Sequence, residues 1–245
     1  VSDNGYVTPG EVVASRAYWK LLEACYRMLA VVSEEDGEGG APPPLSPGAS
    51  TAALNQEVVL ASSVSESVSA TDKNSDDASG GSGLLCHMLK GSRVALDCGA
   101  APGGWTQVLL KELDASVVIA VDPAELDDEV ASLAGVEHWK CGIDEALQRL
   151  TEEQRMLDCF VCDACFHDCA SAIDTVEKAA AILNPGALLV LTLKVVQGHS
   201  TASCQAQVLT QTERLHHRLD QMEVFHLMAN RARERTIVGY WRGNS

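Results

Sequence analysis

The chain has 245 residues, a hydrophobic content of 46% and a formal net charge of −16. This length and apolar content suffice for one large domain or two small ones. The acidic balance disfavours a protein that holds nucleic acid through its overall charge. No run of residues approaches the roughly 20 apolar positions of a membrane-spanning helix, so we expect no membrane segment.

Nine cysteines are present, and their odd number and irregular spacing predict reduced thiols. We therefore expect an intracellular protein, with cytoplasm, nucleus and organelle all open. Cys159, Cys162, Cys165 and Cys169 have the spacing of an iron–sulfur site. However, Cys159 and Cys162 stand three apart in an expected core strand and so face opposite sides. We therefore expect buried thiols and no metal site.

The N-terminal region, residues 1–32, is expected to form a helix over 8–32. Thr8 and Glu11 form a capping-box pattern with Pro9 at the first helical position. Residues 33–83 carry nine acids and one lysine, a balance of −8, and are rich in Ser, Gly and Pro. This low-complexity composition predicts a disordered acidic linker.

Residues 84–245 are expected to form one α/β domain. Apolar runs alternate with helical patterns, which predicts a mostly parallel seven-stranded sheet with helices on both faces. A short final connection predicts a C-terminal antiparallel hairpin. The expected strands are 93–97, 116–121, 136–140, 157–162, 187–193, 222–228 and 235–241. The expected helices are 84–90, 103–113, 125–133, 143–156, 169–183 and 201–220.

A glycine turn after the first of these strands is the main candidate for a ligand site. Residues 94–96 form the apolar strand, the turn spans 99–104, and a helix follows. This arrangement lets the backbone approach a ligand closely. The glycine spacing differs from G-x-G-x-x-G and so disfavours a dinucleotide site. Asp122, at the end of the second strand, stands where α/β nucleotide folds hold a ribose.

Two further charged residues end neighbouring strands. Asp163 follows the strand 157–162 and Lys194 follows 187–193. A lysine at the edge of a core has a lowered pKa or a nearby carboxylate, and Asp163 is the expected partner. Glu234, read by itself, is a solvated acid in a charged turn. Four arginines are expected to cluster near the mouth of the site and to be able to contact phosphates: Arg231, Arg233, Arg235 and Arg242.

Five segments together resemble the FtsJ/RrmJ-type RNA 2′-O-ribose methyltransferases. DCGAAPGGW at 97–105 is similar to the cofactor motif of that family. The other segments are SRAYWKL at 15–21, FVCDA at 160–164, LKVVQG at 193–198 and RARERTIV at 231–238. The resemblance covers roughly residues 10–32 and 84–242.

This resemblance implies a Rossmann-like fold, S-adenosylmethionine as cofactor and an RNA substrate. The N-terminal helix would dock on the catalytic domain. The implied catalytic tetrad is Lys20, Asp163, Lys194 and Glu234. The implied cofactor-binding residues are Ser15, Asp97, Gly99, Ala101, Pro102, Gly103, Gly104, Trp105, Asp122 and Asp163.

The substrate that we expect first is rRNA. The alternatives are an mRNA cap or a tRNA, a non-catalytic S-adenosylmethionine-binding scaffold and, less favoured, a nicotinamide oxidoreductase. Because the chain is acidic, we expect a protein partner, an additional segment or a local basic patch to supply RNA affinity, and a monomer otherwise. Two departures from the family stand out: the long linker, and the displacement of an adenine-binding acid at 140–144.

Overall fold

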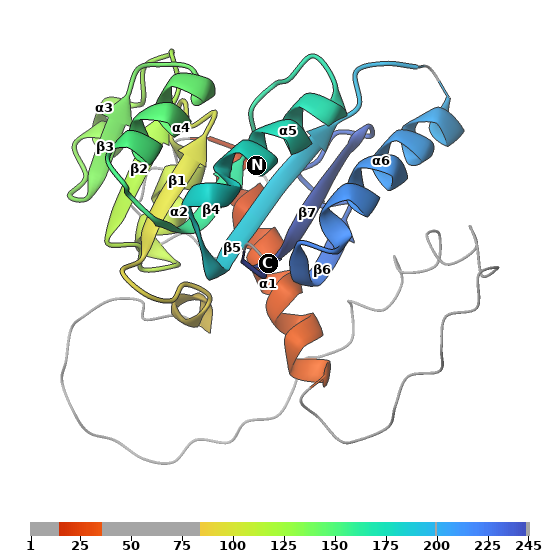
Figure 1. Cartoon of the computed structure of the whole chain (residues 1–245), viewed down its shortest axis with the longest axis horizontal. Coiled ribbons are helices and arrows are strands. Elements are labelled where there is room, and N and C mark those ends of the chain that lie inside the picture. The colour runs from red at the N-terminus through yellow and green to blue at the C-terminus, as the bar shows by residue number, and fades with distance from the viewer. Residues whose placement is uncertain (1–14, 36–83, 199, 244–245) are drawn as a thin grey trace, which may run out of the picture.

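The computed structural model describes residues 15–35, 84–198 and 200–243, and Figure 1 shows how they are arranged. One seven-stranded sheet has the order β3-β2-β1-β4-β5-β7-β6. Strands β1 to β5 pair in parallel, and β7 is antiparallel to both β5 and β6. The predicted fold class is confirmed. The strands are β1 (Val94–Cys98), β2 (Val117–Val121), β3 (Val136–Trp139), β4 (Leu157–Cys162), β5 (Leu183–Lys194), β6 (Leu219–Phe225) and β7 (Glu234–Trp241).

Helices cover both faces of this sheet (Figure 1). One apolar layer joins α1, η2 and α2 to the sheet, and the other joins α4, α5 and α6. The central strands consist mainly of apolar residues because both of their faces are covered. The helices are α1 (Ala17–Glu35), η2 (Leu84–His87), α2 (Gly104–Lys111), α3 (Asp128–Ala131), α4 (Ile143–Glu152), α5 (Cys169–Ala179), η3 (Ala180–Ile182) and α6 (Thr201–His216).

The cysteines of β4 divide between the two layers as strand alternation predicts. Cys159 packs in the layer of α1 and α2, whereas Cys162 packs in the layer of α4 to α6. Both are buried, so they cannot turn toward one cluster without breaking β4. In the parts of the chain that the structure describes, no three His, Cys, Asp or Glu side chains gather as a metal site would require.

Helix α1 begins later and ends later than predicted. Residues 15 and 16 are not helical, and the helix starts at Ala17 and continues to Glu35. The proposed capping box at 8–11 and the linker from residue 36 to 83 lie outside the described residues. Within α1, Leu21, Ala24 and Met28 are fully buried against the domain, so this helix is part of the core. None of the helices in the described ranges is long and apolar enough to cross a bilayer.

The boundary between α6 and β6 was predicted wrongly. The helix ends at His216 and the strand spans Leu219–Phe225, three residues before the expected range. Strand β6 lies at the edge of the sheet. Polar residues such as Asp220 and Glu223 leave it without a regular alternation of apolar and polar positions. Edge strands carry charged residues for solubility, and such a strand lacks the signal on which the prediction relied.

Other element lengths also differ from the predictions. Helices α3 and α4 are shorter, and β5 begins four residues earlier, at Leu183. Residues 183–186 include a proline and a glycine, which sequence patterns assign to turns. Only the tertiary pairing of Leu157 with Leu183 extends the strand through them.

Candidate active site

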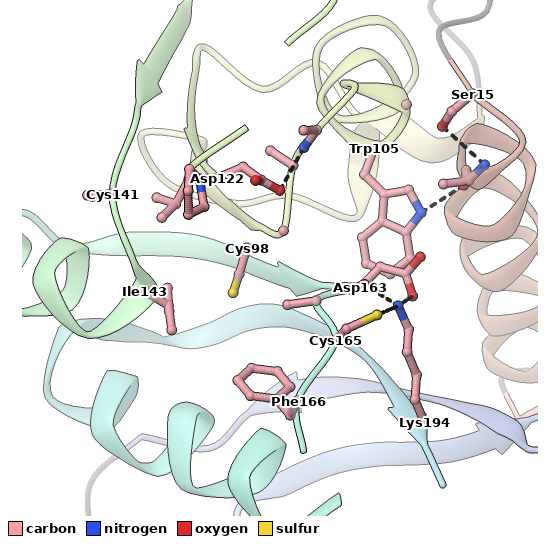
Figure 2. A pocket seen from close by; sticks show the side chains of 18 residues that line it. Ser15, Cys98, Trp105, Asp122, Cys141, Ile143, Asp163, Cys165, Phe166 and Lys194 are labelled. Atoms are coloured by element: carbon pink, nitrogen blue, oxygen red, sulfur yellow. Dashed lines mark hydrogen bonds and ion pairs between the residues drawn. The ribbon is translucent and has the colours of Figure 1, made fainter. Parts of the chain in front are cut away.

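A cavity of about 580 Å³ lies beyond the carboxyl ends of β1, β2, β4 and β5 (Figure 2). This is the place where open α/β sheets bind ligands. Its volume is within the usual range of small-molecule sites, about 300–1,000 Å³. Its charged lining consists of Asp122, Asp163 and Lys194.

The glycine turn forms one wall of the cavity and depends on the absence of side chains. Gly99 has φ of 81°, and a Cβ there would lie 2.7 Å from Cα of Ala164. A Cβ on Gly104 would lie 2.3 Å from Oγ of Ser15. These glycines therefore let the turn after β1 approach both the β4 loop and the start of α1.

Asp122 is fixed at the end of β2 by the same turn. Its Oδ2 accepts the backbone N–H of Ala101 at 3.1 Å, and its Oδ1 accepts that of Ala124 at 2.8 Å. A carboxylate has about four acceptor sites, so capacity remains for ligand hydroxyl groups. This geometry suits the predicted role of Asp122 toward a ribose.

Ser15, two residues before α1, and Ala17, the first residue of α1, complete the cavity (Figure 2). The indole Nε1–H of Trp105 donates to the carbonyl oxygen of Ala17 at 2.7 Å. Oγ of Ser15 accepts the backbone N–H of Ala17 at 3.2 Å. The N-terminal segment is thus joined directly to the glycine turn, although 88 positions separate Trp105 from Ala17.

Lys20 lies behind the cavity and binds two carboxylates. Its Nζ is 3.0 Å from each carboxylate oxygen of Asp163 and 3.2 Å from Oε2 of Glu234. Only 7% of the Lys20 side chain is exposed. The ammonium group therefore has its partners within the protein and fixes α1 to the ends of β4 and β7.

Lys194 occupies the cavity side of Asp163 (Figure 2). Its Nζ donates to the carbonyl oxygen of Asp163, lies 3.3 Å from the carboxylate Oδ1, and is 3.5 Å from Sγ of Cys165. Burial lowers the pKa of Lys194, but the charge of Asp163 and its hydrogen bonds outweigh burial and raise it. Asp163 is therefore the nearby carboxylate that the sequence predicted for Lys194. The alternative prediction, a lowered pKa, is wrong, and the Lys194 amine remains a cation.

Glu234 is not the solvated acid that its local sequence predicts. It is 7% exposed, and β7 pairs it with Lys194 of β5. Burial raises the pKa of Glu234, but the backbone N–H of Arg231 and the charge of Lys20 outweigh that effect and lower it. The buried carboxylate is therefore ionised, and only its family resemblance had indicated a role.

Asp97 lies immediately behind the glycine turn and is 1% exposed. Its Oδ2 accepts the hydroxyl of Thr106 at 2.7 Å, whereas its Oδ1 has no partner among the described residues. Burial raises the pKa of Asp97 from 3.8 to about 7; hydrogen bonds from the hydroxyl and the backbone N–H of Thr106 oppose this shift, and the charges of Asp163 and Asp122 add to it. A buried carboxyl oxygen without a partner is costly, so a positive charge nearby would be favourable.

The predicted residues occupy distinct positions around the cavity. Ser15, Gly99, Ala101, Gly104, Trp105, Asp122, Asp163 and Lys194 line it. Asp97, Pro102 and Gly103 do not line it, and Lys20 and Glu234 reach it through Asp163.

Several lining residues were missed by sequence reasoning. They lie within four residues after the ends of predicted strands, which is the signal that could have identified them. The main ones are Cys98, Cys141, Ile143, Cys165 and Phe166.

At the end of the cavity near β3, the acid that the sequence indicated to be displaced, Asp144, is absent from the lining. Asp144 instead pairs with Lys178 at 2.6 Å on the exposed surface. Cys141 and Ile143 line the cavity there, so this end is apolar rather than acidic. An adenine would therefore contact thiol and aliphatic groups at this position.

The residues present fit S-adenosylmethionine. The cavity has a small-residue wall and is lined by two carboxylates, Asp163 and Asp122, of which Asp122 has spare acceptor capacity. Such a lining suits a ligand with hydroxyl groups and a cationic centre. The unpartnered oxygen of Asp97 behind the wall favours the same charge. No diphosphate cradle of the G-x-G-x-x-G type is present in this turn.

The four arginines do not form one cluster at the mouth. Arg231, Arg233 and Arg235 flank Glu234, and Arg233 donates to the carbonyl oxygen of Gln197 at 2.6 Å. Arg242 follows the far end of β7 and binds Asp220 at 2.5 Å. Because β7 runs away from the site, the expectation that Arg242 lies near the mouth is wrong.

Comparisons with known proteins identify a matching family and solved structures of similar fold. A family model described as FtsJ-like methyltransferase matches residues 83–232. The Methanococcus jannaschii fibrillarin pre-rRNA processing protein is similar with a TM-score of 0.51 and 15% identity, over 62% of this chain and 68% of that chain. A chain of the fibrillarin/Nop5p complex is similar with a TM-score of 0.52 and 17% identity, over 62% of this chain and 74% of that chain.

A putative hemolysin from Lactococcus lactis gives a TM-score of 0.52 and 16% identity, over 64% of this chain and 81% of that chain. At these identities the solved structures establish a shared fold and no more. No match to the curated proteins reaches significance.

Proposed function

The chain belongs to the FtsJ-like methyltransferase family and is an S-adenosylmethionine-dependent methyltransferase, and we propose that its acceptor is the ribose 2′-hydroxyl of an RNA. The observation that carries this proposal is the convergence of Lys20, Asp163, Lys194 and Glu234 beside the cavity. These residues come from α1, the β4 end, the β5 end and β7. When bound, S-adenosylmethionine supplies an electrophilic methyl group on its sulfonium.

Lys194 is the proposed catalytic residue. A ribose hydroxyl is a weak acid, so its attack requires stabilisation of the negative charge that develops on oxygen. The raised pKa keeps the Lys194 amine protonated at neutral pH, and this amine lines the cavity. It would therefore act as a hydrogen-bond donor to the attacking oxygen, and the hydroxyl proton would leave to water at the mouth.

Lys20 and Glu234 are proposed as positioning residues. The Lys20 ammonium is bound by both oxygens of Asp163 and by Glu234, and little of it is exposed. Together they hold the Asp163 carboxylate, which in turn orients the Lys194 amine. In this arrangement Lys20 acts through Asp163 and does not itself contact the ribose or a phosphate.

An rRNA is the proposed acceptor class to test first. It follows from the resemblance of the tetrad segments, and one protein of similar fold is described as a pre-rRNA processing protein. Arg231 and Arg233 beside Glu234 offer a local positive charge for phosphates. The net charge of −16 supports an RNA-binding protein partner as a second contributor. The alternatives are a cap or tRNA acceptor.

The experiment is transfer of a tritiated methyl group to rRNA, tRNA and capped mRNA, followed by mapping of ribose methylation. The wild type is compared with Lys194→Met and Lys194→Arg. Since removing one preorganised donor costs about 10²–10³ in rate, the Met variant should lose at least that factor and the Arg variant should keep part of it.

Lys178→Met is the matched control, because Lys178 is an exposed lysine paired with Asp144 outside the cavity. Equal transfer by the wild type and Lys194→Met would reject the catalytic role. Cofactor binding without transfer to any of the three RNA classes would favour the scaffold alternative.

A further inference from the structure

We propose that the rim of the cavity binds an unpaired RNA strand, with one base stacked on Trp19 and backbone phosphates held by Arg16 and Arg231. The proposal rests on the proposed function, and it adds the form of the RNA and the side chains outside the cavity that bind it. A base stacks on an aromatic side chain only when it has left its duplex, so the expected ligand is single-stranded. We call this rim the mouth surface, and it consists of Arg16, Trp19, Val196, Met228, Arg231 and Arg233.

Trp19 is the most exposed of the four tryptophans. It is 37% exposed, whereas the other three are at most 7% exposed, namely Trp105, Trp139 and Trp241. Trp19 stands between Ala17, which lines the cavity, and Lys20, which binds Asp163. The ring of Tyr18 packs edge-on against the indole, with 5.2 Å between the ring centroids. An accessible, supported aromatic ring beside the site is the kind of platform on which a nucleobase stacks.

Exposed apolar side chains continue this surface on two other segments. Met228, in the connection between β6 and β7, is 82% exposed, and its backbone N–H donates to Oε2 of Glu23 at 2.8 Å. Glu23 follows Trp19 by one helical turn, so the connection lies along the same side of α1. Val196, two residues after Lys194, is 55% exposed. Three segments that are distant in sequence therefore present apolar side chains beside the same site, where the faces of bases would cover them.

The arginines of the mouth surface are available to phosphates. Within residues 15–35, 84–198 and 200–243, Arg16 and Arg231 are exposed and form no ion pair with an acid. Arg233 donates to the neutral carbonyl oxygen of Gln197, so its charge is not compensated by that bond. Most other basic side chains in these ranges are paired with carboxylates, including Arg27, Arg93, Lys140, Arg149, Arg155, Lys178, Arg214 and Arg242. In a protein of net charge −16, this local excess of positive charge matches a polyanion.

The charged groups inside the site do not oppose this surface. The ammonium groups of Lys20 and Lys194 both contact Asp163, and that of Lys20 also contacts Glu234. Two positive and two negative groups therefore balance one another at the base of the mouth. A phosphate that approaches the arginines meets no net repulsion from these four groups.

The test measures binding of a fluorescently labelled, unstructured oligoribonucleotide of roughly ten nucleotides, a length that such surfaces cover. The full chain is compared with Trp19→Leu, which removes the aromatic ring, and Trp19→Phe, which keeps one. Trp19→Leu should lose about 5- to 100-fold in affinity, and Trp19→Phe should lose less. Because the other tryptophans are buried, the bound strand should quench the emission of Trp19 in the wild type. The same sequence annealed to its complement should not quench it.

The arginines are tested by the dependence of affinity on salt. Arg16→Gln and Arg231→Gln should each reduce the slope of log affinity against log salt by about 0.7, the value for one phosphate contact of a single strand. Arg242→Gln is the matched control, because Arg242 is paired with Asp220 at the far end of β7. This control should keep the wild-type slope.

The inference is overturned if the wild type does not bind the strand, if Trp19→Leu binds it as tightly as the wild type, or if the duplex quenches Trp19 equally. An unchanged slope in both arginine variants would also overturn it. These results leave the proposed function standing as long as methyl transfer to RNA requires Lys194. Absence of transfer to every RNA class, with strand binding intact, would overturn the proposed function alone. If thermal unfolding shows that Trp19→Leu folds poorly, Trp19→Phe and the arginine variants decide the question.

Discussion

Lys20 and Asp163 are 143 positions apart, yet Nζ of Lys20 lies 3.0 Å from both carboxylate oxygens of Asp163. This contact joins the N-terminal helix to the centre of the sheet at the edge where the cavity opens. Since Asp163 also binds Lys194, the contact determines where the proposed catalytic amine lies. The energetic and functional consequences of this link can be measured separately.

Replacing Lys20 with Met should destabilise the protein strongly. It would leave Asp163 and Glu234 without their shared cation at positions where 16% and 9% of the side chains are exposed. Removing one partner of a buried ion pair lowers the free energy of unfolding by about 3–5 kcal/mol. Chemical denaturation would measure the loss. Lys178→Met breaks an exposed pair and should cost below about 1 kcal/mol; similar losses in both variants would contradict the buried network.

Gly104→Ala should weaken both the docking of α1 and the binding of cofactor. The new Cβ would lie 2.3 Å from Oγ of Ser15 and 2.9 Å from the backbone nitrogen of Tyr18. Overpacking of this kind costs about 1–3 kcal/mol. Thermal unfolding would detect it. Gly142→Ala is the comparison, because a Cβ there meets nothing within 4 Å, and it should unfold near the wild-type temperature.

Trp105→Phe tests the hydrogen bond between the glycine turn and α1. The substitution keeps an aromatic ring but removes the Nε1–H that donates to Ala17 at 2.7 Å. Loss of one such bond costs about 0.5–1.5 kcal/mol. Amide hydrogen exchange in the first turn of α1 should accelerate while exchange in β4 stays unchanged. Unaltered exchange near Ala17 would show that the bond does not hold the helix.

Asp97→Asn should make stability less dependent on pH. The folded-state pKa of Asp97, about 7, exceeds the ordinary value of 3.8, so the folded protein binds more protons than the unfolded chain between these values. The wild type therefore loses stability as the pH rises from about 4 to 7. Between pH 5 and pH 8 the advantage of the variant should grow by up to about 3 kcal/mol. Chemical denaturation of both proteins at each pH would measure this difference. The same difference in unfolding free energy at pH 5 and pH 8 would rule out the raised pKa.

Much of the fold was predictable because its signals are local. The apolar run of β4 was predicted with its observed bounds, Leu157–Cys162, and the glycine turn was placed between β1 and α2. Parallel strands end at one edge of a sheet, so the proximity of Asp122, Asp163 and Lys194 followed from the strand ends alone. The position of β6 did not follow, because an edge strand rich in polar residues has no apolar pattern.

The sequence by itself determined the α/β architecture, the glycine turn that forms one wall of the cavity, and the family to which the chain belongs. Only the tertiary structure decided the charge states of the site. Glu234 is buried because β7 pairs with β5, and Lys20 is bound between Glu234 and Asp163 because α1 packs beside them. Asp97 has a pKa near 7 because the fold removes its water. Propensity and periodicity act along the chain, whereas burial and charge act through space, and residues distant in sequence set them.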